Sequence, residues 1–195
     1  MAKFILASAS PRRKELLGRI GIDFEVVVSE ADEESVPKDI PVNLYVQELA
    51  MLKAAATAKQ ISGRDKIIIS ADTVVTLDGA VLGKPKDAED AYEMLTKLSD
   101  RVHEVYTGIC VLRMSDAKTV CKTVCTEVRF KQLTPEKISA YIATGEPMDK
   151  AGAYGIQAKG ALLIDGINGD YFNVVGLPIA TLSEVLETEF DIEIL

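Results

Sequence analysis

The run of isoleucines at residues 67–69, within "KIIIS", most constrains the fold of this chain. Three consecutive β-branched residues leave no polar face, which is typical of a central strand that is buried on both sides. Short strand and helix patterns alternate along the rest of the chain, and their connections are short. This alternation favours an α/β protein, in which helices cover the sheet.

The other expected elements can be given by residue range. We expect further strands over about 3–8, 24–28, 102–113 and 118–130, and helices over about 11–20, 42–60, 87–99, 135–144 and 178–188. After "ADTVVTL", Asp78-Gly79 is a hairpin turn signal and "AVL" is the return strand. Residues 146–173 contain five glycines and predict mostly loop around the short strand "ALLI". We therefore predict a single domain over residues 1–195, with a mixed twisted sheet and flanking helices, or a compact domain with two lobes around a cleft.

Composition excludes several classes of protein. A chain with 48% hydrophobic and 27% charged residues is typical of a globular protein, and a net charge of −8 disfavours general binding to nucleic acid or to a membrane surface. No apolar run approaches the roughly 20 residues of a membrane span, and we find no signal peptide. The three cysteines have no ligand-like histidine nearby, since His103 is the only histidine. We interpret them as reduced thiols of a cytoplasmic protein and disfavour a zinc site.

The segment "ASASPRRKELL" places positive charge where a helix start does not need it. Ser10 is the expected N-cap and Pro11 the first helical residue, and Arg12 and Arg13 follow directly. A helix start already carries partial positive charge, so the cations suit an anion bound there. With Ser8, they could form a receptor for a polyphosphate, because arginine pairs match phosphate oxygens. The alternative is that both arginines simply point into water.

A second candidate follows the buried run at 67–69. Asp72 and Thr73 lie in "SADTVV", and a carboxylate at the carboxyl end of a central strand can hold a divalent cation or accept a proton from water. A turn-capping aspartate is the alternative. Lys84, between Gly83 and Pro85, suits contact with a phosphate. "GAVLGKP" is not a P-loop, since it lacks one residue between its glycines and has proline in place of Ser or Thr.

Two polar loops and two single residues complete the candidates. Carboxylates of "ADEE", among them Glu33, could complete a magnesium site with Asp72, or form a solvated charge run. Lys53 lies in the long helix and is either a site residue or a plain exposed lysine. The loop "GEPMDKAGAYGIQAKGA" could form a base pocket in which Gln157 offers a donor and an acceptor, or could be a structural turn. We interpret His103 as structural, because no nucleophile–histidine pair can be assembled.

These motifs, in this order, closely resemble the Maf family of nucleoside triphosphate pyrophosphatases. The resemblance rests on "LASASPRRKELL", "SEADEE", "SADTVV", "LGKP", "HEVYTG", "GEPMDKAGAYGIQAKGA" and "GDYFNVVGLPI", and it spans about residues 3–186. It implies a fold similar to that of the inosine triphosphate pyrophosphatases, with a deep cleft between two lobes, and a homodimer. The implied reaction is hydrolysis of a nucleoside triphosphate to monophosphate and pyrophosphate with a divalent cation, Mg²⁺ or alternatively Mn²⁺ or Co²⁺.

The resemblance also implies roles for individual residues. Asp72 corresponds to the proton acceptor, and the positions linked to substrate choice are those of Arg12, Thr73 and Gln157. Other cleft residues correspond to Ser8, Arg13, Glu33, Lys53 and Lys84, and "AGAYGIQ" belongs to the branch associated with dTTP and UTP. Two alternatives stay open. One is a nucleotide-binding regulator of cell division without turnover, and the other is a pyrophosphatase without pyrimidine preference.

Overall fold

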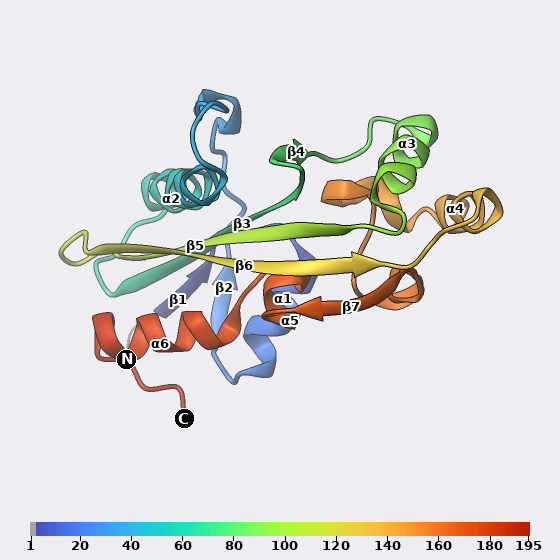
Figure 1. The fold of residues 1–195 in the computed structure, drawn as a ribbon. Helices are drawn as coiled ribbons and strands as arrows, with labels where there is room; N and C mark the ends of the chain where they lie inside the picture. The colour runs from blue at the N-terminus through green and yellow to red at the C-terminus, as the bar shows by residue number, and fades with distance from the viewer. Residues whose placement is uncertain (1–2) are drawn as a thin grey trace. The chain divides into compact units, whose positions relative to one another are not determined.

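The computed structural model describes residues 3–195, and it is a mixed α/β fold. Its elements, drawn in Figure 1, are β1 (Lys3–Leu6), α1 (Pro11–Arg19), β2 (Phe24–Val26), η1 (Glu33–Ser35), α2 (Val42–Gln60), β3 (Lys66–Leu77), β4 (Ala80–Leu82), α3 (Ala88–Leu98), β5 (Val102–Arg113), β6 (Thr119–Phe130), α4 (Pro135–Ile142), η2 (Glu146–Asp149), η3 (Ala151–Ala153), η4 (Ala158–Leu163), β7 (Ile164–Asn168), α5 (Tyr171–Val175) and α6 (Ile179–Phe190). The strands are ordered β2-β1-β3-β5-β6-β7, and β4 pairs with β3. The predicted fold class, a mixed sheet with helices, is confirmed.

Internal contacts divide the chain into two compact units. Unit 1 contains residues 1–72, 107–124 and 176–195, and unit 2 contains residues 73–106 and 125–175. Strands β3, β5 and β6 each contribute residues to both units. The cleft expected between two lobes stays a prediction, as does the single domain over residues 1–195.

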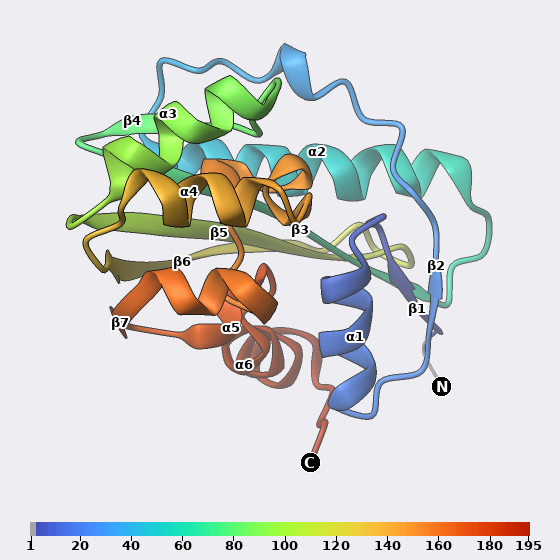
Figure 2. The same cartoon turned by 90° about the vertical axis from the view of Figure 1, so that its right-hand side faces the viewer.

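Unit 1 is built on parallel strands. β1 pairs in parallel with β2 and with β3, in a register that places Phe4 opposite Phe24 and Ile67. β1 and β2 lie side by side in Figure 2. The isoleucines at 67–69 are at most 2% exposed, as expected of a strand covered on both faces. Ile5, Ala50, Ile68 and Cys110 pack together in a core, which therefore joins the sheet to α2.

Two contacts fix α2 against the sheet. A Cβ atom on Gly108 of β5 would lie only 2.2 Å from the carbonyl oxygen of Val46, so the helix backbone approaches the strand as closely as glycine allows. The buried hydroxyl of Ser70 on β3 donates a hydrogen bond of 2.6 Å to the carbonyl of Ala50. Both contacts set the position of α2 along and above the strands.

Unit 2 has its own core, in which α3 and α4 lie side by side (Figures 1 and 2). Apolar residues from these helices, from the sheet and from the loop after α4 share this core; they include Leu95, Leu98, Phe130, Ile138, Tyr154 and Leu163. β7 pairs antiparallel with β6, and a register shift occurs between Arg129 and Phe130. The loop that follows α4 is thus packed into a core at Tyr154 and Leu163.

Several expected elements differ from the structure. "KIIIS" and "ADTVVTL" form one continuous strand, β3, in which residues 67–71 and 74–77 are buried. The predicted strand "ALLI" is wrong, since its first three residues belong to η4 and the strand begins only at Ile164. The second strand ends at Val26 and not at residue 28, and α5 begins at Tyr171, within the range 146–173 for which the sequence predicts mostly loop. None of the helices in residues 3–195 is long and apolar enough to cross a membrane.

Candidate active site

The start of α1 follows the sequence prediction closely. Ser10 is the N-cap, with its side chain accepting a hydrogen bond of 3.5 Å from the backbone N–H of Arg13, and Pro11 opens the helix. The first turn contains no acidic residue. The hydroxyl of Ser8 accepts from the backbone N–H of Ser10 at 3.2 Å. Serine side chains thus shape the turn between β1 and α1, and the positive charge of Arg12 and Arg13 meets no carboxylate within that turn.

Arg13 is held by the backbone around it. Its Nε donates to the carbonyl of Gly176 at 2.8 Å, and its Nη1 donates to the carbonyl of Ala71 at 2.8 Å and to the Ser8 hydroxyl at 3.3 Å. Burial lowers the pKa of this guanidinium, while the nearby carboxylate of Asp72 raises it and the charge of Arg12 lowers it. Arg13 is therefore a fixed cation beside Asp72, and it does not simply point into water.

Lys53, Asp72 and Glu33 form the ionic centre of unit 1. The ammonium of Lys53 lies 2.5 Å from Oδ1 of Asp72 and 3.1 Å from Oε1 of Glu33. The side chains of Lys53 and Asp72 are each 13% exposed, and that of Glu33 is 53% exposed. A charged pair that is largely shielded from water interacts more strongly than a surface pair. Three residues that lie far apart in the sequence thus meet at one ammonium group.

The fold explains how this centre forms. Ser70, two residues before Asp72 on β3, is bonded to Ala50, three residues before Lys53 on α2. The Ser29 hydroxyl donates to the carbonyl of Lys53 at 3.2 Å, which ties the segment before η1 to the same helix. One part of the prediction is wrong: Asp72 lies in the interior of β3, not at its carboxyl end. It lies three residues beyond Ile69, the last residue of β3 that pairs with β1.

Sequence reasoning did not find Tyr45, which borders this centre. Burial raises the pKa of its phenol, and the nearby carboxylates of Asp72, Glu34 and Glu33 raise it further, against the opposing charge of Lys38. Tyr45 and Lys53 are eight residues apart on α2, so they occupy the same helix face. That spacing was a signal in the sequence, once Lys53 was taken as a site residue.

The acidic loop contributes one carboxylate to the centre. Glu33 contacts Lys53, whereas Glu34 forms an exposed pair with Lys38 at 3.0 Å, and the backbone carbonyl of Asp32 accepts from Ser35. Within residues 3–195 no group of three or more His, Cys, Asp or Glu side chains could hold a metal ion by itself. Asp72 and Glu33 converge on one cation, however, and their carboxylate oxygens are the ligand type that Mg²⁺ prefers. The donor type of the pair suits a divalent cation, and the metal site itself stays a prediction.

Three predicted residues belong to unit 2: Thr73, Lys84 and Gln157. Thr73 follows Asp72 directly in β3 and is half-buried. Lys84 is exposed in the turn after β4, and the carbonyl of its neighbour Gly83 accepts a hydrogen bond of 3.0 Å from the backbone of Gly152. The turn that carries Lys84 is thereby tied to the loop after α4.

Most polar groups of that loop, residues 145–161, hold the loop itself. The carboxylate of Glu146 accepts from the backbone N–H groups of Lys159 and Gly160, at 3.4 and 3.3 Å. The hydroxyl of Tyr141 accepts from the N–H of Gly155 at 3.2 Å. Gly160 lies so close to the carbonyl of Gly155 that an added Cβ would be 2.0 Å from its oxygen. We call these contacts of Glu146, Tyr141 and Gly160 the loop clamp.

Several polar residues that the sequence offers for a base pocket are thus engaged within the loop or buried, and the base pocket stays a prediction. Lys150 donates to the carbonyl of Glu146 and pairs with Asp149, each at 2.6 Å. Tyr154 is buried, and its hydroxyl lies 2.6 Å from Nε2 of His103. Both rings pack edge-to-face with Phe130, and burial lowers the pKa of His103 to about 4. Tyr154 and His103 thus have a structural role, as was predicted for His103.

Gln157 is the exception in this loop. It precedes η4 as its N-cap residue, yet its side chain makes no capping hydrogen bond. It is half-buried, and no hydrogen bond joins its amide to any residue in the range 3–195. A half-buried amide with its donors and its acceptor uncommitted can pair with the edge of a ligand. The clamp holds the backbone on both sides of this amide.

Known proteins resemble this chain over much or all of its length. Residues 3–189 match the model of the Maf family, which is described as Maf-like protein. A dTTP/UTP pyrophosphatase of Clostridium novyi (strain NT) is 53% identical over 94% of this chain and 95% of its own length, and one of Alkaliphilus metalliredigens (strain QYMF) is 53% identical over 100% of both chains. Among solved structures, a HAM1 protein from Coxiella burnetii is 20% identical with a TM-score of 0.47, covering 67% of this chain and 73% of that one. On the evidence of the family match and of these relatives, the chain belongs to the Maf family.

Proposed function

We propose that this protein is a nucleoside triphosphate pyrophosphatase that hydrolyses dTTP and UTP to the monophosphate and pyrophosphate. The proposal is carried by the ionic centre of unit 1, where Lys53, Asp72 and Glu33 meet near the cationic start of α1. It is supported by the full-length relatives, which are named dTTP/UTP pyrophosphatases. Basic groups with a partly shielded carboxylate suit hydrolysis of a phosphoanhydride.

Binding of the triphosphate would use positive charge in a chain of net charge −8. Arg12 and the N–H groups at the start of α1 suit phosphate oxygens, and Arg13, fixed by Ser8 and by two carbonyls, adds a preorganised charge. We propose that Lys53 contacts the triphosphate in addition to its ion pair with Asp72. The anion would supply the negative charge that the first turn of α1 lacks.

In the reaction, a water oxygen bonds to the α-phosphorus and the bond from that phosphorus to the bridging oxygen breaks, so pyrophosphate leaves. We assign Asp72 as the group that accepts the proton of this water, with Lys53 orienting the carboxylate by its contact at 2.5 Å. Asp72 and Glu33 would hold a divalent cation, Mg²⁺ or alternatively Mn²⁺ or Co²⁺, which would offset phosphate charge. Arg12 and Arg13 would stabilise the charge of the departing pyrophosphate, and contact of Lys84 with a phosphate stays a prediction.

Base selection is assigned to Gln157 of unit 2. The uncommitted amide of Gln157 can donate to and accept from a pyrimidine, and Thr73 and Arg12 occupy the other positions linked to substrate choice. The alternative of a pyrophosphatase without pyrimidine preference makes a different prediction. If Gln157 reads the base, Gln157→Ala lowers the ratio of dTTP to GTP hydrolysis, whereas an unchanged ratio favours the alternative.

The proposal is tested by the products. The purified protein is incubated with Mg²⁺ and each common nucleoside triphosphate, the nucleotides are separated by chromatography, and pyrophosphate is assayed separately. We expect monophosphate and pyrophosphate, formed fastest from dTTP and UTP. Diphosphate with orthophosphate would place the attack at the γ-phosphorus and contradict the mechanism. Intact nucleotides with Mg²⁺, Mn²⁺ and Co²⁺ would favour the nucleotide-binding regulator, which the activity named for the relatives disfavours.

The metal assignment has its own test, because the chain offers a matched pair of glutamates. Glu33 contacts Lys53, whereas its neighbour Glu34 pairs with Lys38 in solvent. We expect Glu33→Gln to raise the Mg²⁺ concentration that gives half-maximal activity, and Glu34→Gln to leave it unchanged. Equal Mg²⁺ dependence in both variants would remove Glu33 from the assignment. The homodimer and the cytoplasmic location stay predictions, to be tested by light scattering and by cell fractionation.

A further inference from the structure

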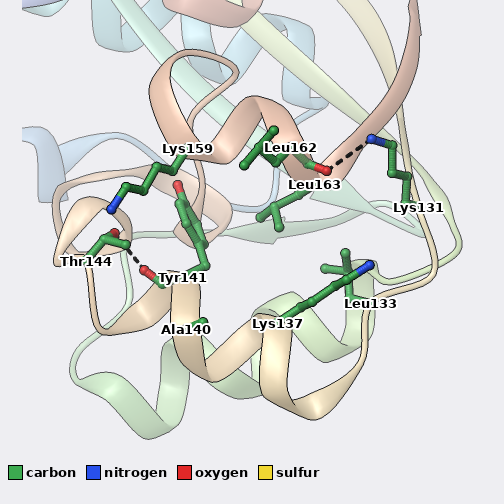
Figure 3. A pocket seen from close by; sticks show the side chains of 9 residues that line it. All are labelled: Lys131, Leu133, Lys137, Ala140, Tyr141, Thr144, Lys159, Leu162 and Leu163. Carbon is green, nitrogen blue, oxygen red and sulfur yellow. Dashed lines mark hydrogen bonds between the residues drawn. The ribbon is translucent and has the colours of Figure 1, made fainter.

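A pocket in unit 2 is lined by none of the residues that are assigned to the proposed reaction. It has a volume of about 400 Å³, which lies within the range of about 300–1,000 Å³ typical of small-molecule sites. Figure 3 shows its walls, which come from α4, from the segment between β6 and α4, and from η4. The lining residues are Lys131, Leu133, Lys137, Ala140, Tyr141, Thr144, Lys159, Leu162 and Leu163.

The inner surface of this pocket is apolar. Leu133 and Leu163 are at most 9% exposed, and the largely buried ring of Tyr141 lies between α4 and η4. Leu162 is 71% exposed at the rim, which is unusual for a leucine that borders a concavity. Covering this side chain with an apolar group would remove hydrocarbon surface from water. The pocket therefore favours a ligand with an apolar body.

The charge of the rim is of one sign. Three lysines line the pocket and no carboxylate does, although the chain as a whole carries a net charge of −8. Lys131 donates to the carbonyl of Leu162 at 3.2 Å, which orients its ammonium and leaves further donors for a ligand. The ammonium groups of Lys137 and Lys159 form no ion pair within the range 3–195. In Figure 3 the ammonium groups of Lys131 and Lys137 lie on one side of the pocket and that of Lys159 on the other.

We propose that this pocket binds a small organic anion with an apolar or aromatic body, such as an aryl or branched-chain carboxylate. The body would lie against Leu133, Leu162 and Tyr141, and the anionic group would lie between Lys131 and Lys137. The site differs from the proposed triphosphate site in composition, since no arginine lines it and its walls are mostly hydrocarbon. A polyphosphate would leave these walls exposed to water, so an amphipathic anion is the better match in both charge and surface.

The test compares two ligands that differ only in charge, 1-naphthaleneacetate and its neutral amide. Binding to the full chain is measured by titration calorimetry, and the site is located by amide shifts in NMR spectra. We expect the carboxylate to bind about tenfold more tightly than the amide, as two partly exposed charge contacts allow, and this advantage to shrink with added salt. Shift changes should centre on residues 137–144 and 159–163.

Variants assign the contacts. Lys137→Gln should remove most of the preference for the carboxylate without changing the affinity for the amide. Lys159→Gln, on the opposite side of the pocket, should change the preference for the carboxylate by less than about twofold. Lys59→Gln, an exposed lysine of α2, serves as a control for net charge. Thermal melts check that each variant is folded. Equal affinities for the two ligands, equal effects of Lys137→Gln and Lys159→Gln, or no binding at millimolar concentration would overturn the proposal. So would binding that disappears as the protein is concentrated, because a second copy would then occupy the pocket.

Discussion

The two units use polar side chains in opposite ways. In unit 1, charged groups contact one another, with Lys53 shared between Asp72 and Glu33. In unit 2, the polar groups of the loop at 145–161 mostly bind its own backbone, and Gln157 alone is left with an uncommitted amide. Shared charges can be redistributed when an anion binds, whereas a clamped backbone presents one fixed group. We therefore propose that the ionic centre of unit 1 carries the chemistry and that Gln157 of unit 2 contributes to selectivity.

The strongest test of the role of unit 1 is Asp72→Asn. An amide cannot accept the proton of the attacking water, so we expect hydrolysis of dTTP to fall by about 10²–10⁴-fold. Binding of dTTP should be retained or tightened, because a carboxylate that repels phosphate is removed. Rates are measured by pyrophosphate release and binding by calorimetry, with the exposed Asp23→Asn as the control. Activity that survives in Asp72→Asn would contradict the assignment of the base.

The support beneath the ionic centre is tested by Gly108→Ala. The new Cβ would lie 2.2 Å from the carbonyl oxygen of Val46, and a helix backbone cannot yield as a side chain does. We expect the free energy of unfolding to fall by about 3 kcal/mol, with activity lost as α2 shifts. Gly18→Ala is the matched control, because its Cβ would meet nothing within 4 Å and alanine favours a helix. A stable and active Gly108→Ala protein would show that this close approach does not fix Lys53.

The buried contact between His103 and Tyr154 in unit 2 predicts a pH dependence of stability. Burial lowers the pKa of His103 to about 4 in the folded protein, from about 6.5 in an unfolded chain. The unfolded state binds the proton first, so this stabilisation is fully present above about pH 6.5 and is lost as the pH falls toward 4. The loss amounts to about 3 kcal/mol. Denaturant titrations of the wild type and of His103→Gln from pH 4 to 7 measure this loss of unfolding free energy. His103 is the only histidine, so no other imidazole contributes. If the unfolding free energies of the two proteins change in parallel with pH, His103 is not the cause.

The smallest effects are expected from the loop clamp. Glu146→Gln and Tyr141→Phe each weaken a hydrogen bond to the loop that carries Gln157, worth about 1 kcal/mol. We expect the ratio of kcat/KM for dTTP and GTP to fall about fivefold, mainly through KM for dTTP, while kcat changes little. The exposed Glu187→Gln is the control. A fall in kcat with an unchanged ratio would mean that the clamp supports the fold and not selectivity.

Much of the fold was predictable because local patterns were strong. The helix at 42–60 and the strand at 102–113 match the structure, as does the cap Ser10. Predictions failed where tertiary packing overrode a local signal. "ALLI" has an apolar pattern typical of a strand, yet its first residues form η4, in which Gly160 packs against the carbonyl of Gly155.

The sequence by itself determined which chemical groups the protein has: arginines at a helix start, Asp72 after a run of buried isoleucines, and a loop with glycine and Gln157. Spacing along the chain is enough for this, because caps, turns and strands depend on near neighbours. Only the tertiary structure decided that Lys53 meets Asp72 and Glu33, that Arg13 is pinned by Ala71 and Gly176, and that Tyr154 lies buried beside His103. Such contacts join residues far apart in sequence, and their geometry depends on how helices pack on the sheet, which no local pattern encodes.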